Sequence, residues 1–366
     1  MMGRAPFVPQ RSSPARDQAF VEVRDLAKHY RVRGGRGSTI KAVDGVSFDI
    51  REGEVLGLVG ESGCGKSTIA RLLVRLASPT AGAIRIDQRD ILALNGEQLR
   101  RMRPTMQLIF QDPYAALDPR MTVGASMEAP LAQHGVGTPA SRTLAVQQML
   151  VEVGLDASFH GRYPNQCSGG QLQRAGIGRA LLLKPWFLVC DEPTSALDAS
   201  MRTQILNLLN DLKKRLGLTL LMISHDLRVV RYLCDRIAVM YLGQIVEIAP
   251  RDVLFERPRH PYTHALITSA MIGEAGLAGV AQQLKGDLPS PLNPPPGCRL
   301  HLRCAYATER CAREVPPLHQ MGDGHAVRCH YWDQLNLGIG PGARTPERTP
   351  ERAGGLAAMD AAGSHI

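Results

Sequence analysis

Gly60-Glu-Ser-Gly-Cys-Gly-Lys-Ser-Thr68 joins an apolar run at 55–59 to a helical pattern at 68–76. It matches G-x-x-x-x-G-K-[ST] between a strand and a helix, the pattern of a phosphate-binding loop. The glycines let the backbone wrap around phosphates, so that its N–H groups and the start of the helix face negative charge. Lys66 is predicted to neutralise the β- and γ-phosphates, and Ser67 to bind Mg²⁺ through its hydroxyl. The predicted nucleotide-binding residues of this loop are Gly60, Ser62, Gly63, Gly65, Lys66, Ser67 and Thr68.

Two carboxylates end a second apolar run, Trp186-Phe-Leu-Val-Cys-Asp191-Glu192. A buried strand can hold an acid at its C-terminal edge, which is where a metal-bound phosphate lies in open α/β sheets. Asp191 is predicted to help hold Mg²⁺, and Glu192 to act as the general base on an attacking water. The alternative is ordinary surface charge at the end of a strand.

A second anion-binding motif opens the helical pattern at 172–183. It is Ser168-Gly169-Gly170-Gln171, and the start of its helix is a second place for phosphate within one chain. One nucleotide cannot easily use two separate cradles on the same subunit. The motif therefore predicts two subunits packed head to tail, each supplying these residues to the nucleotide in the other's phosphate loop. The alternative is a helix N-cap with flexible glycines.

Strand and helix patterns alternate from about residue 20 to 247, which predicts a largely parallel sheet covered by helices. The expected fold class is α/β: a P-loop ATPase core with a mixed or parallel sheet, an inserted helical subdomain and a small Cys-containing C-terminal extension. Pro-rich turn signals after Arg257 begin the extension. The expected parts are a disordered tail at 1–18, the ATPase domain at 19–257 with its helical subdomain at about 114–180, the extension at 258–336 and a disordered tail at 337–366.

Composition excludes several classes of protein. The 366 residues carry 43 Lys and Arg against 34 Asp and Glu, a net charge of +9. The basic residues are spread along the chain, so we expect no nucleic-acid partner. No apolar stretch approaches the roughly 18 residues of a membrane span, and no signal peptide is evident. A cytosolic protein is expected, with membrane association through a partner.

The phosphate loop, Ser168-Gly-Gly-Gln171, Asp191-Glu-Pro193 and Ser224-His225-Asp226 resemble, in this order, the nucleotide-binding subunits of ATP-binding-cassette (ABC) transporters. The resemblance covers about residues 20–250. It implies that ATP is the nucleotide and that hydrolysis drives transport. It also implies that Gln111 contacts Mg²⁺ and the attacking water, and that His225 senses the γ-phosphate.

Three further expectations come from the same resemblance. Asp198, in Ser195-Ala-Leu-Asp198, would belong to a loop that links the two ATP sites across a dimer. Tyr30 would stack on adenine, with a core tyrosine as the alternative. Cys167 stands where the family usually has Leu, and Cys190 stands before the two acids; we expect both thiols to be buried and inert.

The segment Asp112-Pro-Tyr-Ala-Ala-Leu-Asp118 and the later Arg259-His-Pro-Tyr262 resemble the dipeptide and oligopeptide importer ATPases. The resemblance implies a partner ATPase in a heterodimer, two membrane-spanning permease subunits and an extracytoplasmic binding protein. It places the chain at the cytoplasmic face of the bacterial inner membrane. Nickel, glutathione or another small solute is the alternative cargo, and a soluble ABC ATPase without a transport role is the alternative function.

Four cysteines crowd into the extension, at Cys298, Cys304, Cys311 and Cys329. Their spacing fits neither short zinc pairs nor ferredoxin motifs, so unligated thiols, zinc and iron–sulfur all stay open. The resemblance to peptide-importer ATPases implies a [4Fe–4S] cluster held by the four thiolates. Nearby histidines leave mixed zinc ligation open; these are His301, His325 and His330.

Overall fold

The computed structural model describes residues 19–32, 38–271, 284 and 286–339. The predicted tail at 1–18, nearly all of the predicted tail at 337–366 and the loop expected at 34–37 lie outside these residues. The chain forms two compact units. Among the described residues, the first unit comprises those up to Lys28, Val43–Val59 and Gly65–Asp235. The second comprises the described residues between His29 and Ala42, Gly60–Cys64 and those from Arg236 onward.

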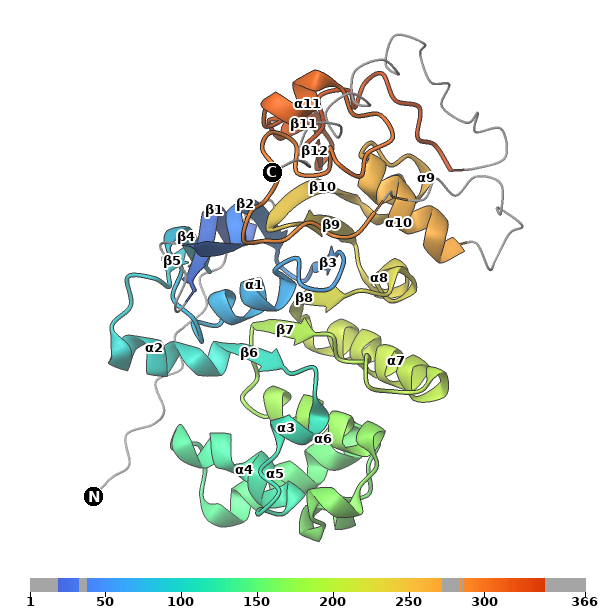
Figure 1. Cartoon of the computed structure of the whole chain (residues 1–366). Coiled ribbons are helices and arrows are strands. Elements are labelled where there is room, and N and C mark those ends of the chain that lie inside the picture. The colour runs from blue at the N-terminus through green and yellow to red at the C-terminus, as the bar shows by residue number, and fades with distance from the viewer. Residues whose placement is uncertain (1–18, 33–37, 272–283, 285, 340–366) are drawn as a thin grey trace, which may run out of the picture. The chain divides into compact units, whose positions relative to one another are not determined.

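A parallel sheet forms the centre of the first unit (Figure 1), in the order β3-β8-β7-β6. Every residue of β3, β7 and β8 is buried, which fits the continuous apolar runs of strands covered on both faces. Helices α1 and α8 pack against these strands. The bounds are β3 Val55–Val59, β6 Met106–Ile109, β7 Phe187–Asp191, β8 Thr219–Ser224, α1 Lys66–Leu73, α7 Ala199–Leu216 and α8 Leu227–Leu233.

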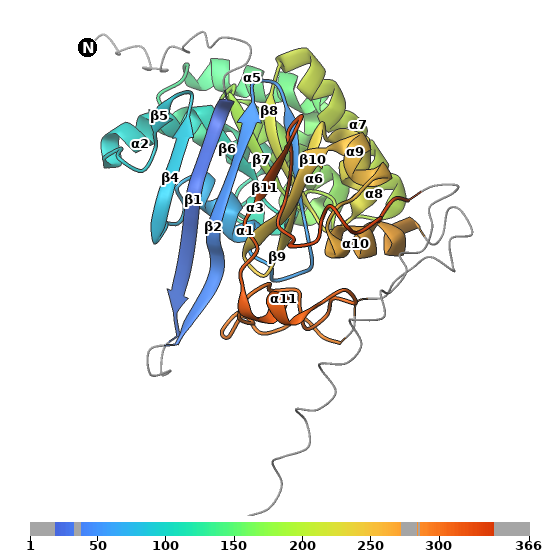
Figure 2. The ribbon, with the colours of Figure 1, turned by 90° about the horizontal axis from the view of Figure 1, so that it is seen from above.

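A four-stranded sheet in the order β2-β1-β4-β5 accompanies it, and Figure 2 shows β2, β1 and β4 side by side. Strand β1 pairs with β4 antiparallel, with Val21 opposite Ile86, and the register shifts at a bulge between Arg24 and Ala27. The bounds are β1 Ala19–Arg31, β2 Thr39–Arg51, β4 Ala81–Ile86, β5 Arg89–Asp90, and the helical pieces that follow are α2 Gly96–Met102 and η1 Arg103–Thr105.

Helices occupy the chain between β6 and β7, and α4, α5 and α6 pack against one another. Their N-caps, Thr122, Thr138 and Ser168, each accept a hydrogen bond from a backbone N–H of the first turn. The bounds are α3 Pro113–Ala116, α4 Val123–Gln133, α5 Pro139–Glu152, η2 Ala157–Gly161, η3 Pro164–Gln166 and α6 Gly169–Leu181. The α/β class with a helical insertion is confirmed.

The second unit contains antiparallel strands in the order β11-β12-β10-β9. The domain boundary was expected at Arg257, whereas the compact units divide between Asp235 and Arg236. The reason is that β10 pairs with β12 of the extension, with Glu247 opposite Val327. The bounds are β9 Arg236–Tyr241, β10 Gln244–Pro250, α9 Arg251–Glu256, α10 Pro261–Met271, α11 Glu309–Arg313, β11 His319–Gly322 and β12 His325–Val327.

Glu247 joins three parts of the second unit. Its side chain is fully buried. It accepts hydrogen bonds from the backbone N–H groups of Arg259 (2.7 Å) and His260 (3.0 Å), and Nε2 of His325 lies 2.9 Å away. A buried carboxylate is stable only when its oxygens are satisfied in this way. Glu247 therefore fixes the entry to α10 and strand β12 onto β10.

Glu247→Gln should destabilise the second unit by about 2 kcal/mol, because the new amide presents N–H to groups that are themselves donors. The measurement is hydrogen exchange at the β12 amides, which should become faster as this segment opens more often. Glu309→Gln is the matched control, since Glu309 is exposed and pairs with an equally exposed Arg313. Equal protection in both variants would contradict the anchoring role.

Candidate active site

Backbone conformation explains the glycines of the phosphate loop. Gly63 and Gly65 have φ of 80° and 110°, in the left-handed region that side chains disfavour. Gly60 also has a positive φ, and a Cβ there would collide with the Met240 carbonyl. Helix α1 begins directly at Lys66, which is buried. The loop is thus built as a backbone turn that leads into a helix N-terminus, as the motif predicts.

Parallel strands bring the predicted acids and their partners to one sheet edge. The register places Val59 opposite Ser224, Ile223 opposite Asp191, and Cys190 opposite Ile109. The residues that follow these four strand ends therefore meet at the same edge. They are the phosphate loop after β3, His225 after β8, Glu192 after β7 and Gln111 after β6.

Ser67 and Asp191 form the candidate Mg²⁺ site. The Ser67 hydroxyl donates to Asp191 Oδ1 at 3.0 Å, so both oxygens already point to one place. Burial raises the pKa of the Asp191 carboxyl, and the hydrogen bond from Ser67 works against that rise. Hydroxyl and carboxylate oxygens are the hard ligands that Mg²⁺ prefers, so this pair fits the ion. The ion, when bound, would neutralise charge on the phosphates.

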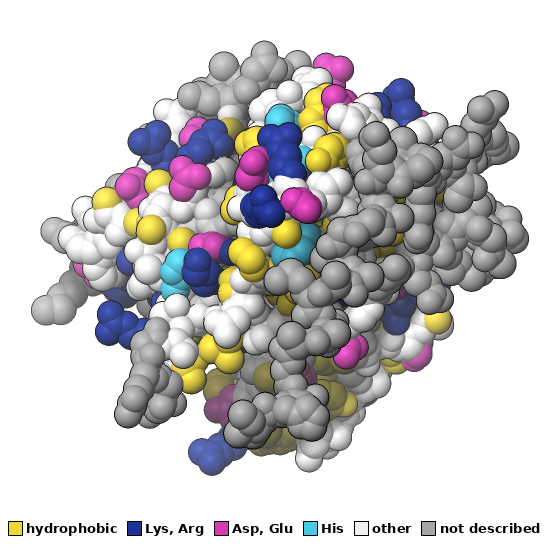
Figure 3. All heavy atoms as spheres, turned by 45° about the horizontal axis from the view of Figure 1, so that its top comes forward, with side chains coloured by type: hydrophobic (Ala, Val, Ile, Leu, Met, Phe, Trp, Pro, Cys, Tyr) yellow, Lys and Arg dark blue, Asp and Glu magenta, His cyan; other side chains and the backbone are white. Residues whose placement is uncertain are grey.

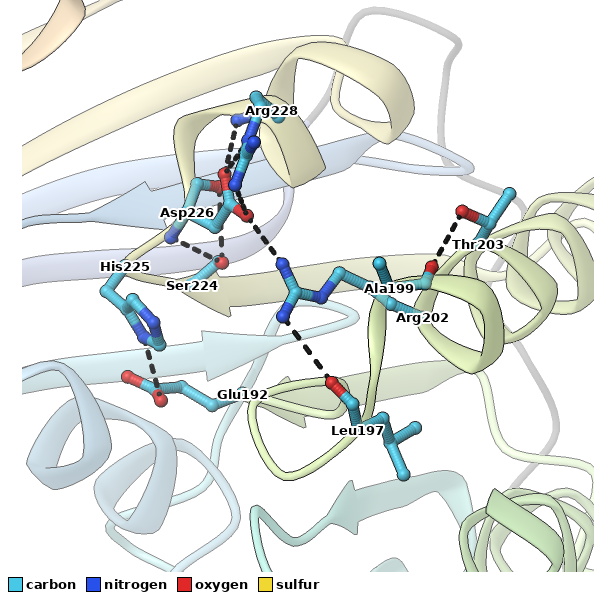
Figure 4. Close-up of polar contacts among 9 residues, drawn as sticks. All are labelled: Glu192, Leu197, Ala199, Arg202, Thr203, Ser224, His225, Asp226 and Arg228. Carbon is cyan, nitrogen blue, oxygen red and sulfur yellow. Dashed lines mark hydrogen bonds and ion pairs between the residues drawn. The ribbon is translucent and has the colours of Figure 1, made fainter. Parts of the chain in front are cut away.

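Glu192 contacts both of the other predicted catalytic residues. Its Oε2 accepts a hydrogen bond from Gln111 Nε2 at 3.2 Å. The same oxygen lies 3.0 Å from His225 Nδ1 (Figure 4). The side chain of Glu192 is 14% exposed, whereas that of His225 is 58% exposed. Glu192 also has φ of 48°, which is uncommon for a non-glycine residue and typical of functional sites. The structure thus brings together the three predicted catalytic residues.

A hydrogen-bonded chain behind Glu192 was missed by the sequence analysis. Arg202 on α7 donates to Asp226 Oδ2 at 3.0 Å, and Asp226 also accepts from Arg228 (Figure 4). Arg202 donates as well to the Leu197 carbonyl, at 3.5 Å. The arginine therefore ties the segment 195–198 to the segment 224–226, which carries His225. The one signal in the sequence is the spacing of apolar residues in α7, such as Ile205 and Leu209, which places Arg202 near the inward face of the helix.

Ser168 and Gln171 form a reciprocal capping box at the start of α6. The Ser168 N–H donates to Gln171 Oε1 at 2.8 Å, and the Gln171 N–H donates to Ser168 Oγ at 3.4 Å. Ser168 itself is exposed, and Gly170 packs close to Met201, whose sulfur leaves no room for a Cβ. The N-cap alternative is thus confirmed as local geometry, and it leaves the serine accessible to a ligand from outside.

Comparisons with known proteins identify the family of the chain. The ABC transporter family model matches residues 43–195, and the model for the oligopeptide/dipeptide transporter C-terminal region matches residues 246–311. A putative peptide import ATP-binding protein of Brucella ovis is 50% identical over 310 residues, covering 85% of this chain and 97% of that one. The chain belongs to the ABC transporter ATP-binding subunits.

Two further members of this ABC family place it in more detail. The oligopeptide transport ATP-binding protein AppF of Bacillus subtilis is 44% identical over 325 residues, covering 87% of this chain and 99% of that one. A solved ATP-binding cassette, dimeric in a post-hydrolysis state with ADP and Pi, superposes with a TM-score of 0.58 at 31% identity. The match covers 63% of this chain and 98% of that chain.

Several smaller expectations for the ABC subunit can be compared with the structure. Tyr30 is 39% exposed, so the core-tyrosine alternative is wrong. Asp198 caps α7 by accepting from the Met201 N–H at 2.8 Å. Cys190 is fully buried and burial raises its pKa strongly, as expected of an inert thiol. Cys167 is only partly buried, because its side chain borders an exposed turn, so the expectation of burial is wrong there.

The four cysteines of the extension line one small cavity, together with His260, His301 and His330. Burial raises the pKa of the Cys298 thiol to about 11 and that of Cys329 to about 12. Across the part of the chain that the structure describes, no group of three or more His, Cys, Asp or Glu is placed to hold a metal ion. This geometry favours neither zinc nor an iron–sulfur cluster over the other.

On the face in Figure 3, Lys and Arg side chains alternate with Asp and Glu rather than forming one basic field. Within the described residues, no helix is both long enough and apolar enough to cross a bilayer.

Glu192→Gln should lower kcat for ATP hydrolysis at least ~100-fold, the usual contribution of a general base, while MgATP binding is retained. Steady-state phosphate release and nucleotide binding by fluorescence would measure the two effects separately. Glu97→Gln is the control, because Glu97 is an exposed residue of α2 that pairs with Arg100. Unaltered turnover in Glu192→Gln would remove Glu192 from the reaction.

Proposed function

We propose that this chain is the ATP-hydrolysing subunit of a bacterial importer for dipeptides and oligopeptides. The single observation that carries the proposal is Glu192, held by Gln111 and His225 at the sheet edge where Ser67 and Asp191 pair. That arrangement supplies a base and a metal site beside a phosphate loop. The names of the relatives supply the cargo, because peptide or oligopeptide import is what they state.

Each side chain has a definite task in this proposal. Lys66 neutralises the β- and γ-phosphates, and Ser67 and Asp191 hold Mg²⁺. Glu192 takes a proton from the attacking water, and its carboxylate is oriented by Gln111. His225 lies against the same carboxylate and is exposed, so it is able to reach a γ-phosphate. Tyr30 is assigned to the adenine ring.

Two cassettes are proposed to share each nucleotide. Ser168, Gly169, Gly170 and Gln171 of one subunit face the phosphates held by the loop of the other, and Asp198 links the two sites. Support comes from the exposed Ser168 at a helix N-terminus and from the dimeric state of the solved cassette. ATP binding would then close the dimer, and hydrolysis would reopen it.

The remaining partners follow from the family. We assign a second ATPase of similar sequence, two permease subunits and an extracytoplasmic binding protein, with this chain at the cytoplasmic face of the inner membrane. No nucleic acid is needed. The match to the oligopeptide/dipeptide C-terminal region supports peptide over nickel or glutathione as cargo. ATP binding to the closed state, rather than any contact with cargo, supplies the driving force.

A [4Fe–4S] cluster on Cys298, Cys304, Cys311 and Cys329 is retained as a proposal. Four thiolates are the ligand set that such a cluster needs, and all four side chains line one cavity. The cluster would serve structure or redox sensing, because the hydrolytic residues are complete without it. No step of ATP hydrolysis passes through it.

A strain that lacks this chain should fail to grow on di- and oligopeptides as its amino-acid source, and the wild-type gene should restore growth. Glu192→Gln and Ser168→Arg should both fail to restore it, the second because an Arg side chain blocks the facing site. Exposed Glu97→Gln should restore it fully. Normal growth on peptides, with loss of nickel or glutathione uptake instead, would replace the proposed cargo.

The cluster proposal predicts roughly four irons and matching acid-labile sulfide per chain after anaerobic purification. Cys304→Ser should lose most of the iron, whereas Cys234→Ser, a buried cysteine of the first unit, should keep it. Iron-free protein of full ATPase activity would reject the cluster, and the four cysteines would then be unligated thiols.

A further inference from the structure

The first half of the phosphate loop is packed by the C-terminal extension. Residues Gly60–Cys64 belong to the second compact unit, together with the chain from Arg236 onward. Side chains of that unit reach Glu61, the second residue of the loop. None of the ATP-site residues discussed above accounts for these contacts, so they need a separate explanation.

Arg303 makes a forked ion pair with Glu61. Its Nη1 lies 2.9 Å from Oε2, and its Nη2 lies 3.1 Å from Oε1 of the same carboxylate. The side chain of Arg303 is only 10% exposed and that of Glu61 is 28% exposed. Paired N–H···O bonds of this kind hold a carboxylate in one orientation more firmly than a single contact does.

Two tyrosines complete the environment of this pair. The backbone N–H of Glu61 donates to the hydroxyl of Tyr262 at 2.9 Å, and Arg303 Nη1 donates to the hydroxyl of Tyr241 at 3.4 Å. The rings of the two tyrosines are in contact, with centroids 4.7 Å apart. The extension therefore holds both the side chain and the backbone of Glu61, and Tyr241 of β9 supports Arg303.

Arg303 is itself held on a short rigid turn. Its N–H and that of Cys304 both donate to the Leu300 carbonyl, and the Cys298 N–H donates to the Cys311 carbonyl. Burial lowers the pKa of the guanidinium, but the hydrogen bonds to Glu61 and Tyr241 raise it by more. Arg303 therefore keeps its charge. A fixed cation is thus presented to one carboxylate of the loop.

The negative charge of Glu61 explains why an arginine lies beside it. Glu61 precedes Lys66 in a loop that must receive a polyanion, and an unpaired carboxylate there would repel the phosphates. Pairing with Arg303 cancels that charge and turns the carboxylate toward the extension. A purely structural contact would need no charge at this position, since an apolar pair of similar size stabilises a fold at least as well.

We infer that Arg303 of the C-terminal extension is a positioning residue of the ATP site, which neutralises Glu61 and holds Gly60–Cys64 in the conformation that receives the phosphates. Arg303 acts through Glu61 and does not touch the nucleotide. The inference rests on the proposed role of the loop in binding ATP. It gives the extension an indirect part in nucleotide affinity, through Glu61.

Arg303→Met should raise the Kd for MgATP about tenfold, the typical cost of losing a charge-assisted hydrogen bond, while kcat at saturating ATP changes less than about twofold. The defect should shrink as salt is raised, because the uncovered charge of Glu61 is screened. The matched control is Arg310→Met in the same extension, since Arg310 pairs on the exposed surface with Glu314. Titration of the full-length protein with MgATP at low and high salt provides the measurement.

Glu61→Gln in the Arg303→Met background separates charge from structure. Removing the repelling carboxylate should return the Kd to within about threefold of wild type, although the ion pair is still absent. A double variant no better than the single one, or a single variant that binds ATP like wild type at low salt, would overturn the inference. Wild-type protein that does not bind MgATP would instead refute the proposed function. Thermal unfolding of each variant separates local effects from loss of fold.

Discussion

Parallel strands that end together impose the geometry on which this site depends. The pairing register of β3, β8, β7 and β6 sets where each strand ends. The phosphate loop, His225, Glu192 and Gln111 come just after these ends. Glu192 can contact Gln111 and His225 only because three strands bring their carboxyl ends to the same edge. A slip of one residue in β3, β7 or β8 would exchange its side chains between two faces that are both packed, so the apolar core enforces the catalytic register.

Loops after the strands are then fixed by polar contacts that the core cannot provide. Asp226 both caps α8 and accepts from Arg202, so one carboxylate secures the segment that carries His225. The bonds from Arg228 lower the pKa of Asp226 against the effect of burial, which keeps it ionised for this role. Because Arg202 also reaches the Leu197 carbonyl, one side chain links the segment before Asp198 to the segment that carries His225.

Local patterns in the sequence were enough to predict the phosphate loop, the acids after β7 and the helix that starts after Ser168. Each of these depends on residues close in sequence, such as glycines with positive φ or a serine that caps its own helix. The links from Arg202 to Asp226 and from Arg303 to Glu61 could not be predicted in this way. The second joins residues 242 positions apart, and an arginine carries no sign of which acid it will meet.

The compact units divide between Asp235 and Arg236, whereas the sequence pattern changes at Arg257. Turn-forming prolines mark where regular structure stops, but compactness depends on which strands pair, and β10 pairs with β12 across the prolines. Glu247 then receives donors from both sides of that segment, so the buried carboxylate ties the end of the cassette to the extension. Tyr262 and Arg303 of the same unit form hydrogen bonds with Glu61 of the phosphate loop. On the inference above, the extension therefore contributes to the conformation of the nucleotide site.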